Sequence, residues 1–221
     1  EMKMDFIDVR RAYFHAEALR DLYVDLPPED ATPGMCGKLN KSMYGTRDAA
    51  QNWEKAYGDL MASIGFKVGV SGPCVFYHRD RNIRAVVHGD DFTFCGLEGD
   101  LVWIRKLMET WFEIKVRGIL GPDVGHGKEI TILGRKVVWG DDGITYEADP
   151  KHRELVMEFF GFCDRSKESR YNGLREGSEV AEDWEELVGK EATEFRGVAA
   201  RMNYLSLDCP DLQFPIKESS R

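Results

Sequence analysis

Two adjacent carboxylates inside an otherwise apolar run constrain the fold of this chain more than any other feature. The run Val86–Phe94 reads VVHGDDFTF, so β-branched and aromatic residues surround Gly89, Asp90 and Asp91. Such residues favour strands, and an unpaired charge in a core costs several kcal/mol. The run therefore predicts two strands that meet at a tight turn carrying the carboxylates. Taken alone, it is read most simply as a solvated turn.

A third carboxylate, Asp8, ends a short apolar strand that is predicted near the start of the chain. One Asp at a strand end and an Asp-Asp turn on a later hairpin are typical of enzymes that hold two Mg²⁺ ions about 4 Å apart. Mg²⁺ takes few carboxylates together with water and phosphates, so three Asp suffice without His or Cys. We therefore expect Asp8, Asp90 and Asp91 to be the metal ligands and catalytic residues, with two Mg²⁺ ions as the cofactor and Mn²⁺ able to replace them.

Five blocks of the sequence resemble, in the right order, the reverse transcriptases of copia-type LTR retrotransposons. The blocks are Asp8–Tyr13, Lys41–Trp53 (KSMYGTRDAAQNW), His88–Asp91 (HGDD), Ile132–Gly134 (ILG), and Met202–Leu205 with Cys209–Phe214. They are similar to the family's first polymerase motif, its KSLYGLKQAPRxW and YVDD sequences, its FLG strand and its MYL and RPDI segments. Any one block would be weak evidence, whereas five in order are a specific signal.

The predicted elements follow the order strand, helix, strand, hairpin, helix and strand. This order describes a split βαβ unit of the α+β class, an antiparallel sheet with helices on one face. With the resemblance, we assign residues 1–118 to a reverse transcriptase palm. The chain is expected to be a piece of a Pol polyprotein whose fingers region is largely missing.

The second region, residues 119–221, is expected to be a small β-hairpin followed by a helical region that resembles a thumb or connection. The hairpin is predicted from strands over Glu129–Trp139 and Ile144–Glu147, joined by the turn Gly140–Gly143. The Asp-Asp pair in that turn is interpreted as a plain turn. Residues 165–183 are predicted to be a linker.

By resemblance, the residues after Asp8 meet the incoming nucleotide. The backbone amides around Arg11 and Ala12 are expected to face the triphosphate. Tyr13 is expected to lie under the sugar as a gate that excludes the ribose 2′-hydroxyl, although it could instead be a core aromatic beside Phe14. The expected nucleotide-binding residues are Val9, Arg11, Ala12, Tyr13 and Asp48.

Two positions depart from the family pattern. Asp48 stands where the family usually has a Gln that contacts the nucleotide or template. A negative charge there would either repel phosphate or serve as the cap of the helix that follows. His88 stands where the family prefers an aromatic, and it either stacks under the primer end or is a neutral core imidazole. The expected nucleic-acid-binding residues are Lys41, Arg47 and His88.

The resemblance implies an RNA-directed DNA polymerase, a nucleotidyltransferase, although the net charge of −9 is unfavourable for binding nucleic acid. Its implied partners are an RNA or DNA template, a DNA primer, deoxynucleoside triphosphates, and the RNase H and integrase regions of the same polyprotein. No membrane span is predicted, and the expected location is intracellular, in a cytoplasmic virus-like particle or the nucleus.

Two other interpretations stay open. The chain could be a degenerate or repurposed palm that resembles a reverse transcriptase and binds nucleic acid or protein without polymerising. It could also be a different nucleotidyltransferase that uses two metal ions.

Overall fold

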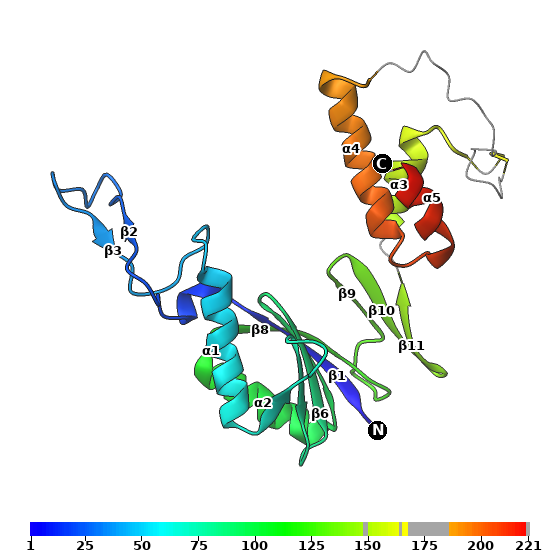
Figure 1. Cartoon of the computed structure of the whole chain (residues 1–221). Coiled ribbons are helices and arrows are strands. Elements are labelled where there is room, and N and C mark those ends of the chain that lie inside the picture. Colours follow the sequence, from blue (N-terminus) through cyan, green and yellow to red (C-terminus); the bar gives the residue numbers. More distant parts are fainter. Residues whose placement is uncertain (148–149, 164, 168–185, 220–221) are drawn as a thin grey trace. The chain divides into compact units, whose positions relative to one another are not determined.

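The computed structural model describes residues 1–147, 150–163, 165–167 and 186–219 (Figure 1). The predicted linker at residues 165–183 lies largely outside these ranges. Among the described residues, no helix is both long and apolar enough to cross a bilayer.

The chain divides into two compact units. Glu1–Ile130 and Trp139–Asp141 form the first unit, and Thr131–Val138 and Asp142–Arg221 form the second. The first unit contains all of the predicted site residues. The division into a palm and a connection-like region stays a prediction.

A six-stranded antiparallel sheet, with the strand order β4-β5-β6-β7-β1-β8, forms the centre of the first unit. Its strands are β1 (Lys3–Val9), β4 (Phe66–Val68), β5 (Val75–His78), β6 (Ile83–His88), β7 (Asp91–Gly96) and β8 (Ile114–Leu120). Helix α1 (Ala49–Ser63) lies between β1 and β4 in the chain, and α2 (Glu98–Trp111) connects β7 to β8. Strands β1 and β6 are both antiparallel to β7, which lies between them, so the strands follow the predicted split βαβ order. The α+β class is confirmed.

Both helices cover the same face of this sheet (Figure 1). Every second residue of β6 and β7 is buried, beginning with Ile83 in β6 and Phe92 in β7. These buried residues belong to one core cluster together with residues of the two helices. The helical residues in that cluster repeat at helical spacing: Trp53, Tyr57, Met61, Leu101, Ile104 and Met108. Burial of each large apolar side chain contributes about 1.5–3 kcal/mol. The alternate residues, such as Val86 and His88, stay exposed, so the other face of β6 is open.

Two ionic contacts fasten β1 to α2. Arg105 donates from Nε and Nη2 to Oδ2 of the fully buried Asp5, at 3.0 and 2.7 Å. Burial raises the pKa of the Asp5 carboxyl above its usual value, while Arg105 acts in the opposite direction. Lys3, also buried, pairs with Glu98 at 2.6 Å and with Asp123. Strand β1, which carries Asp8, is therefore tied to α2 at Lys3 and Asp5.

Shorter elements follow β1. They are the 3-10 helix η1 (Ala12–His15) and the strands β2 (Tyr23–Val24) and β3 (Gly37–Lys38). Strand β2 has only two residues, which pair with β3. Pro27 and Pro28 lack the backbone N–H that would extend it.

A three-stranded sheet replaces the predicted small hairpin. Its strands are β9 (Glu129–Ile132), β10 (Arg135–Gly140) and β11 (Gly143–Glu147), in the order β11-β10-β9. The prediction of one strand over Glu129–Trp139 is wrong, because Leu133 and Gly134 turn the chain with φ of 50° and 75°. Positive φ at both central residues is typical of a type I′ turn, which Leu does not signal in a sequence. The predicted turn between Gly140 and Gly143 is confirmed.

The other elements of the second unit, among the residues that the structure describes, are helices. They are α3 (Pro150–Phe159), α4 (Gly189–Leu205), the 3-10 helix η2 (Pro210–Leu212) and α5 (Gln213–Ser219). Arg135 of β10 lies over the rings of Tyr146 and Tyr204, 5.3 and 5.1 Å from their centroids, and pairs with Asp208. This guanidinium ties the sheet to the end of α4.

Candidate functional site

The Asp-Asp pair lies at the turn between β6 and β7. Gly89 and Asp90 are the two turn residues, and His88 is directly opposite Asp91. Gly89 has a φ of 62°, whereas Asp90 has a negative φ, as a type II′ turn requires. Open space surrounds the position of a Cβ at Gly89, so it is the backbone conformation that favours glycine here.

Strand β1 brings Asp8 beside this turn. The register places Asp8 directly opposite Asp91, and the amide of Val9 donates to the carbonyl oxygen of Asp90 at 2.9 Å. Directly opposite residues of two antiparallel strands project from the same face. Asp8 and Asp91 are half-buried on the open face of the sheet, and Asp90 is exposed. The structure thus brings Asp8 beside the turn of Asp90 and Asp91, from which it is far apart in the sequence.

Basic residues of β8 compensate the opposed carboxylates. Like charges directly opposite each other destabilise a sheet. Arg117 donates from Nη1 to Oδ1 of Asp91 at 3.0 Å, and Lys115 is directly opposite Asp8 on its other side. Side chains of the protein itself therefore supply positive charge at this point.

The carboxylates suit Mg²⁺ by their donor chemistry, because this ion takes oxygen ligands and commonly one or two carboxylates together with substrate phosphates. Within the part of the chain that the structure describes, no group of three or more His, Cys, Asp or Glu side chains is arranged to hold a metal ion. Of the three expected ligands, Asp8 and Asp91 are opposite each other on β1 and β7, and Asp90 precedes Asp91 in the turn. The pair fits a divalent cation, whereas a closed set of three ligands is not formed among these residues.

The residues expected to meet a nucleotide form the turn after β1. Val9 and Ala12 are buried in the core, so they can offer only backbone groups to a ligand. Arg11 has φ 54° and ψ 40°, a left-handed conformation that is uncommon outside glycine. Tyr13 is half-buried and is the second residue of the short helix η1, which follows this bend.

Glu113 engages both arginines of this turn. Its carboxylate accepts from Nη1 of Arg10 at 3.0 Å and from Arg11, and its backbone carbonyl accepts from the Arg10 amide at 2.8 Å. Arg11, and then Arg10, lower the pKa of the Glu113 carboxyl below its usual value. Exposed ion pairs of this kind are weak, so a phosphate can compete for these guanidiniums.

Tyr13 stacks on an aromatic residue from the second sequence block. Its ring lies 4.4 Å from that of Tyr44 between centroids, at an interplanar angle of 29°. Phe14 meets the Tyr44 ring edge-on at 5.6 Å. Tyr13 also packs against the hydrophobic core. Tyr13 is therefore held between the core and the half-exposed ring of Tyr44.

Asp48 pairs with an arginine that the sequence does not single out. It occupies the N-cap position of α1, but its side chain makes no capping hydrogen bond. Instead it accepts from Nε and Nη2 of Arg20 at 3.0 and 3.1 Å. These bonds hold the pKa of the Asp48 carboxyl below its usual value. The negative charge at this position is thus balanced by Arg20.

The three expected nucleic-acid-binding residues differ in their surroundings. Lys41 pairs with Glu17 at 2.5 Å. Arg47 is exposed, and no ion pair is formed by it with another described residue. His88 is exposed on the open face of the sheet, so it is not a core imidazole.

Sequence reasoning missed two contacts at the Asp-Asp turn. Alternation along residues 114–120 could have placed Arg117 on a strand surface, but its pairing with Asp91 depends on which strand lies next to β8. Trp53 donates from Nε1 to the carbonyl oxygen of Gly89 at 2.7 Å, yet its sequence signal is only that of an apolar helix residue. A buried indole usually finds an acceptor, but the sequence does not say which one.

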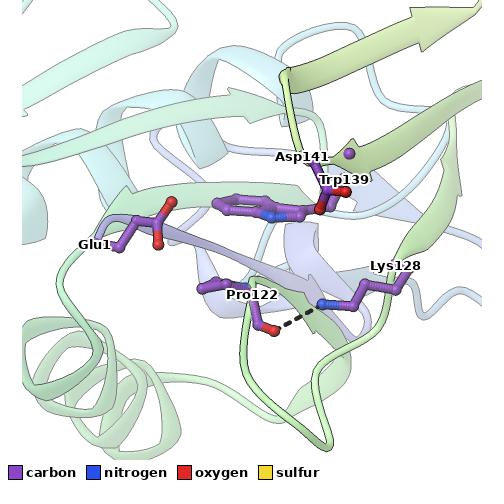
Figure 2. Close-up of a pocket in the computed structure, with 6 residues that line it drawn as sticks. Glu1, Pro122, Lys128, Trp139 and Asp141 are labelled. Carbon is purple, nitrogen blue, oxygen red and sulfur yellow. Dashed lines mark hydrogen bonds between the residues drawn. The ribbon is translucent and has the colours of Figure 1, made fainter.

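A hollow of about 280 Å³ lies elsewhere in the first unit, and no predicted site residue lines it (Figure 2). Its wall includes Pro122, Lys128 and Trp139. The Lys128 ammonium donates to the carbonyl oxygens of Gly121 and Pro122 at 2.7 and 2.9 Å. The ammonium group of this lysine, which ends the glycine-rich segment 118–128, is therefore bonded to the backbone of the same segment.

Comparison with known proteins gives two findings. Residues 1–124 match the family described as reverse transcriptase (RNA-dependent DNA polymerase). Over 145 residues, 62% of this chain, the sequence is 26% identical to the "Retrovirus-related Pol polyprotein from transposon TNT 1-94" of Nicotiana tabacum. The match covers 10% of that polyprotein, so the chain spans about a tenth of the length of this curated relative.

Proposed function

The chain belongs to the family of reverse transcriptases, RNA-dependent DNA polymerases, and from this premise we propose that it is the RNA-directed DNA polymerase domain of a copia-type retrotransposon. The proposed reaction is the template-directed addition of a deoxynucleotide to a primer 3′-hydroxyl. One observation carries the proposal: Asp8 and Asp91 are directly opposite each other on an open sheet face, beside a turn that bears Asp90.

The proposal extends to the division of the chain. We assign residues 1–118 to a polymerase palm and residues 119–221 to a region that resembles a connection or thumb. The split βαβ order of β6, β7, β1 and β8 supports the first assignment. The three-stranded sheet and the helices that follow it are compatible with the second.

Asp8, Asp90 and Asp91 are the proposed ligands of Mg²⁺, with two ions as the full complement and Mn²⁺ as a substitute. When bound, the ions would lower the pKa of the primer hydroxyl and neutralise charge on the triphosphate. The carboxylates would hold and orient the cations, and their opposition across β1 and β7 supports this role. Arg117, which now pairs with Asp91, would give up that contact as the carboxylate turns to a cation.

The turn after β1 is the proposed nucleotide site. Its exposed guanidiniums, Arg10 and Arg11, would exchange Glu113 for triphosphate oxygens, and the amides near Ala12 would add hydrogen bonds. The ring of Tyr13, stacked on Tyr44, would limit the space beside the sugar and so exclude a 2′-hydroxyl. Val9 would act through its backbone, and Asp48 through its pairing with Arg20.

The open face of the sheet is the proposed seat of the primer and template. His88 lies on this face, and Lys41 and Arg47 supply further positive charge to meet phosphates. The proposed partners are an RNA or DNA template, a DNA primer and deoxynucleoside triphosphates. RNase H and integrase regions are expected in the same polyprotein, and the proposed location is a virus-like particle or the nucleus.

Primer extension tests the proposed function with a matched pair of variants. Asp90→Asn removes a proposed ligand from one Asp-Asp turn, and Asp142→Asn makes the same change in the other Asp-Asp turn. The native chain should extend a DNA primer on an RNA template with Mg²⁺. Asp90→Asn should lower the rate by roughly 10³-fold, because positioned electrostatic groups contribute rate factors of that order, whereas Asp142→Asn should match the native rate. Equal rates for both variants, or no extension by the native chain, would contradict the proposal.

A further inference from the structure

The backbone of Asp90 is held on both sides by hydrogen bonds from two different elements. The Gly89 carbonyl oxygen accepts from Nε1 of Trp53 at 2.7 Å. The Asp90 carbonyl oxygen accepts from the amide of Val9 at 2.9 Å. Two successive carbonyl groups are thus held in place, one by a side chain of α1 and one by the backbone of β1.

The two bonds differ in what maintains them. The Val9 amide belongs to the strand that pairs with β7, so its position follows from the sheet. The Trp53 bond comes from a side chain alone. Its acceptor lies in an exposed two-residue turn, and open space surrounds the position that a Cβ would take at the turn glycine. Exposed turns are more mobile than the elements that they connect. A fixed donor here therefore restrains the backbone of the turn.

The indole of Trp53 is well suited to be a fixed donor. Its side chain is almost fully buried, with 1% exposed. Its ring meets Phe112, Tyr57 and Phe92 edge-on, with centroids 5.0, 5.3 and 6.3 Å away. A ring packed on several sides cannot follow the turn if the turn moves. The position of the indole N–H therefore sets the position of the Gly89 carbonyl oxygen. A buried indole N–H without an acceptor is costly, so this bond is favoured.

We propose that Trp53 is a positioning residue for the carboxylate of Asp90. Its N–H fixes the carbonyl of Gly89 and thereby the plane of the Gly89–Asp90 peptide, which sets where the Asp90 side chain starts relative to Asp8. This inference rests on the proposed function, in which those carboxylates hold divalent cations. Trp53, the last residue of the second sequence block, would thus orient the Asp-Asp turn of the third block through one hydrogen bond.

The test removes the N–H and keeps the ring. In the full chain, Trp53 is replaced by 3-benzothienylalanine, in which sulfur takes the place of the indole N–H. Trp53→Phe is the genetic counterpart, and Trp111→Phe is the control on another aromatic residue that packs against the same core. Mn²⁺ binding is measured from the electron paramagnetic resonance signal of free Mn²⁺. Melting curves without metal verify that each variant is folded.

Loss of the N–H should weaken Mn²⁺ binding about tenfold, because groups that orient metal ligands contribute factors of 10–100 in affinity. Trp111→Phe should stay within about twofold of the native chain, as expected for a site without a ligand contact. In an Asp90→Asn background, Trp53→Phe should have no further effect on Mn²⁺ binding, because the carboxylate that it positions is gone. A purely structural role for Trp53 would weaken binding equally in both backgrounds.

A nuclear magnetic resonance measurement reads the same bond directly. The indole ¹⁵N–¹H signal of Trp53, identified by its loss in Trp53→Phe, should shift when Mg²⁺ is added to the native chain and stay unchanged in Asp90→Asn. Native Mn²⁺ affinity in the benzothienyl variant, or an indole signal that is indifferent to bound Mg²⁺, would overturn the role of Trp53 and leave the proposed function intact. Mn²⁺ binding that is absent from the native chain, or unaffected by Asp90→Asn, would contradict the proposed metal site and this inference together.

Discussion

Asp8 and Asp91 are directly opposite each other on adjacent antiparallel strands, β1 and β7, on the face of the sheet that the helices leave open. Two carboxylates in that relationship repel each other and destabilise the sheet. Arg117 offsets part of this repulsion through its bond to Asp91. We therefore expect an added cation to be stabilising beside this pair and the adjacent carboxylate of Asp90.

Mg²⁺ should therefore raise the melting temperature of the native chain. A ligand that binds only the folded state at 100 times its Kd adds about 2.7 kcal/mol, which corresponds to roughly 5–10 °C for a chain of this size. Asp8→Asn should abolish most of this rise, because it removes one of the two opposed carboxylates. Thermal melting across a Mg²⁺ titration measures both, with Asp142→Asn as the control that retains the full rise. An equal rise in native chain and Asp8→Asn would remove Asp8 from the proposed site.

Arg117→Ala should lower the free energy of unfolding without Mg²⁺ and should increase the stabilisation that Mg²⁺ provides. Without Mg²⁺, the loss of the Asp91 contact should lower the free energy of unfolding by roughly 0.5–1 kcal/mol, the upper range for a partly exposed ion pair. With saturating Mg²⁺, the stabilisation by the metal should be larger than in the native chain, because Arg117 no longer competes for the carboxylate. Urea unfolding with and without Mg²⁺ measures the two values. A smaller gain from Mg²⁺ in the variant would mean that Arg117 assists the cation rather than competing with it.

Local patterns in the sequence predict most of the first unit. The spacing of Trp53, Tyr57 and Met61 predicts α1, and the alternating apolar residues on both sides of Gly89 predict the β6–β7 hairpin. Both signals depend on residues that are close together in the chain. The turn at Leu133 escapes such reasoning because Leu with positive φ is rare, so Glu129–Trp139 reads as one strand.

The partners of the site residues are much harder to predict. That Asp48 pairs with Arg20 depends on how the segment between β1 and α1 folds back. The contact between Arg117 and Asp91 depends on the order of β8, β1 and β7. These pairings arise from register and packing between distant segments, for which a single sequence carries no local signal. The resemblance predicts which carboxylates form the proposed site, but not which basic side chains pair with them.

Asp48→Asn should destabilise the fold at neutral pH, and the difference should shrink in acid. Arg20 holds the pKa of Asp48 below its ordinary value of 3.8. A carboxyl with a lowered native pKa contributes stability that is fully present above the unfolded value and is lost as the pH falls through the native value. Urea midpoints for Asp48→Asn and the native chain should therefore differ at pH 7 and converge below pH 3.8. A difference independent of pH would assign the effect to packing rather than to charge.

Arg105→Met should be among the most damaging single changes in the first unit. It leaves the carboxyl of Asp5 buried without its cation, and breaking a buried pair in this way destabilises proteins by about 3–5 kcal/mol. Burial already raises the native pKa of Asp5 above its ordinary value of 3.8, and Arg105 opposes that rise. Without Arg105 the native pKa should therefore move further upward.

The pH dependence of this destabilisation follows from that shift. A carboxyl with a raised native pKa takes up a proton in the folded state before it does so in the unfolded state. Its contribution to stability is therefore greatest below the unfolded pKa and is lost as the pH rises through the native pKa. The effect of Arg105→Met should accordingly be smaller at pH 5 than at pH 7, as measured by urea unfolding followed by tryptophan fluorescence.

Two further variants separate charge from packing in this test. Lys106→Met changes the neighbouring exposed residue of α2 and should alter the free energy of unfolding by no more than about 0.5 kcal/mol. Adding Asp5→Asn to Arg105→Met should recover much of the loss and remove its pH dependence, because the unpaired charge is then gone. If the double variant were as unstable and as pH-dependent as Arg105→Met, the buried charge of Asp5 would not be the cause. The anchoring of β1 to α2 would then depend on the packing of the Arg105 side chain rather than on its charge.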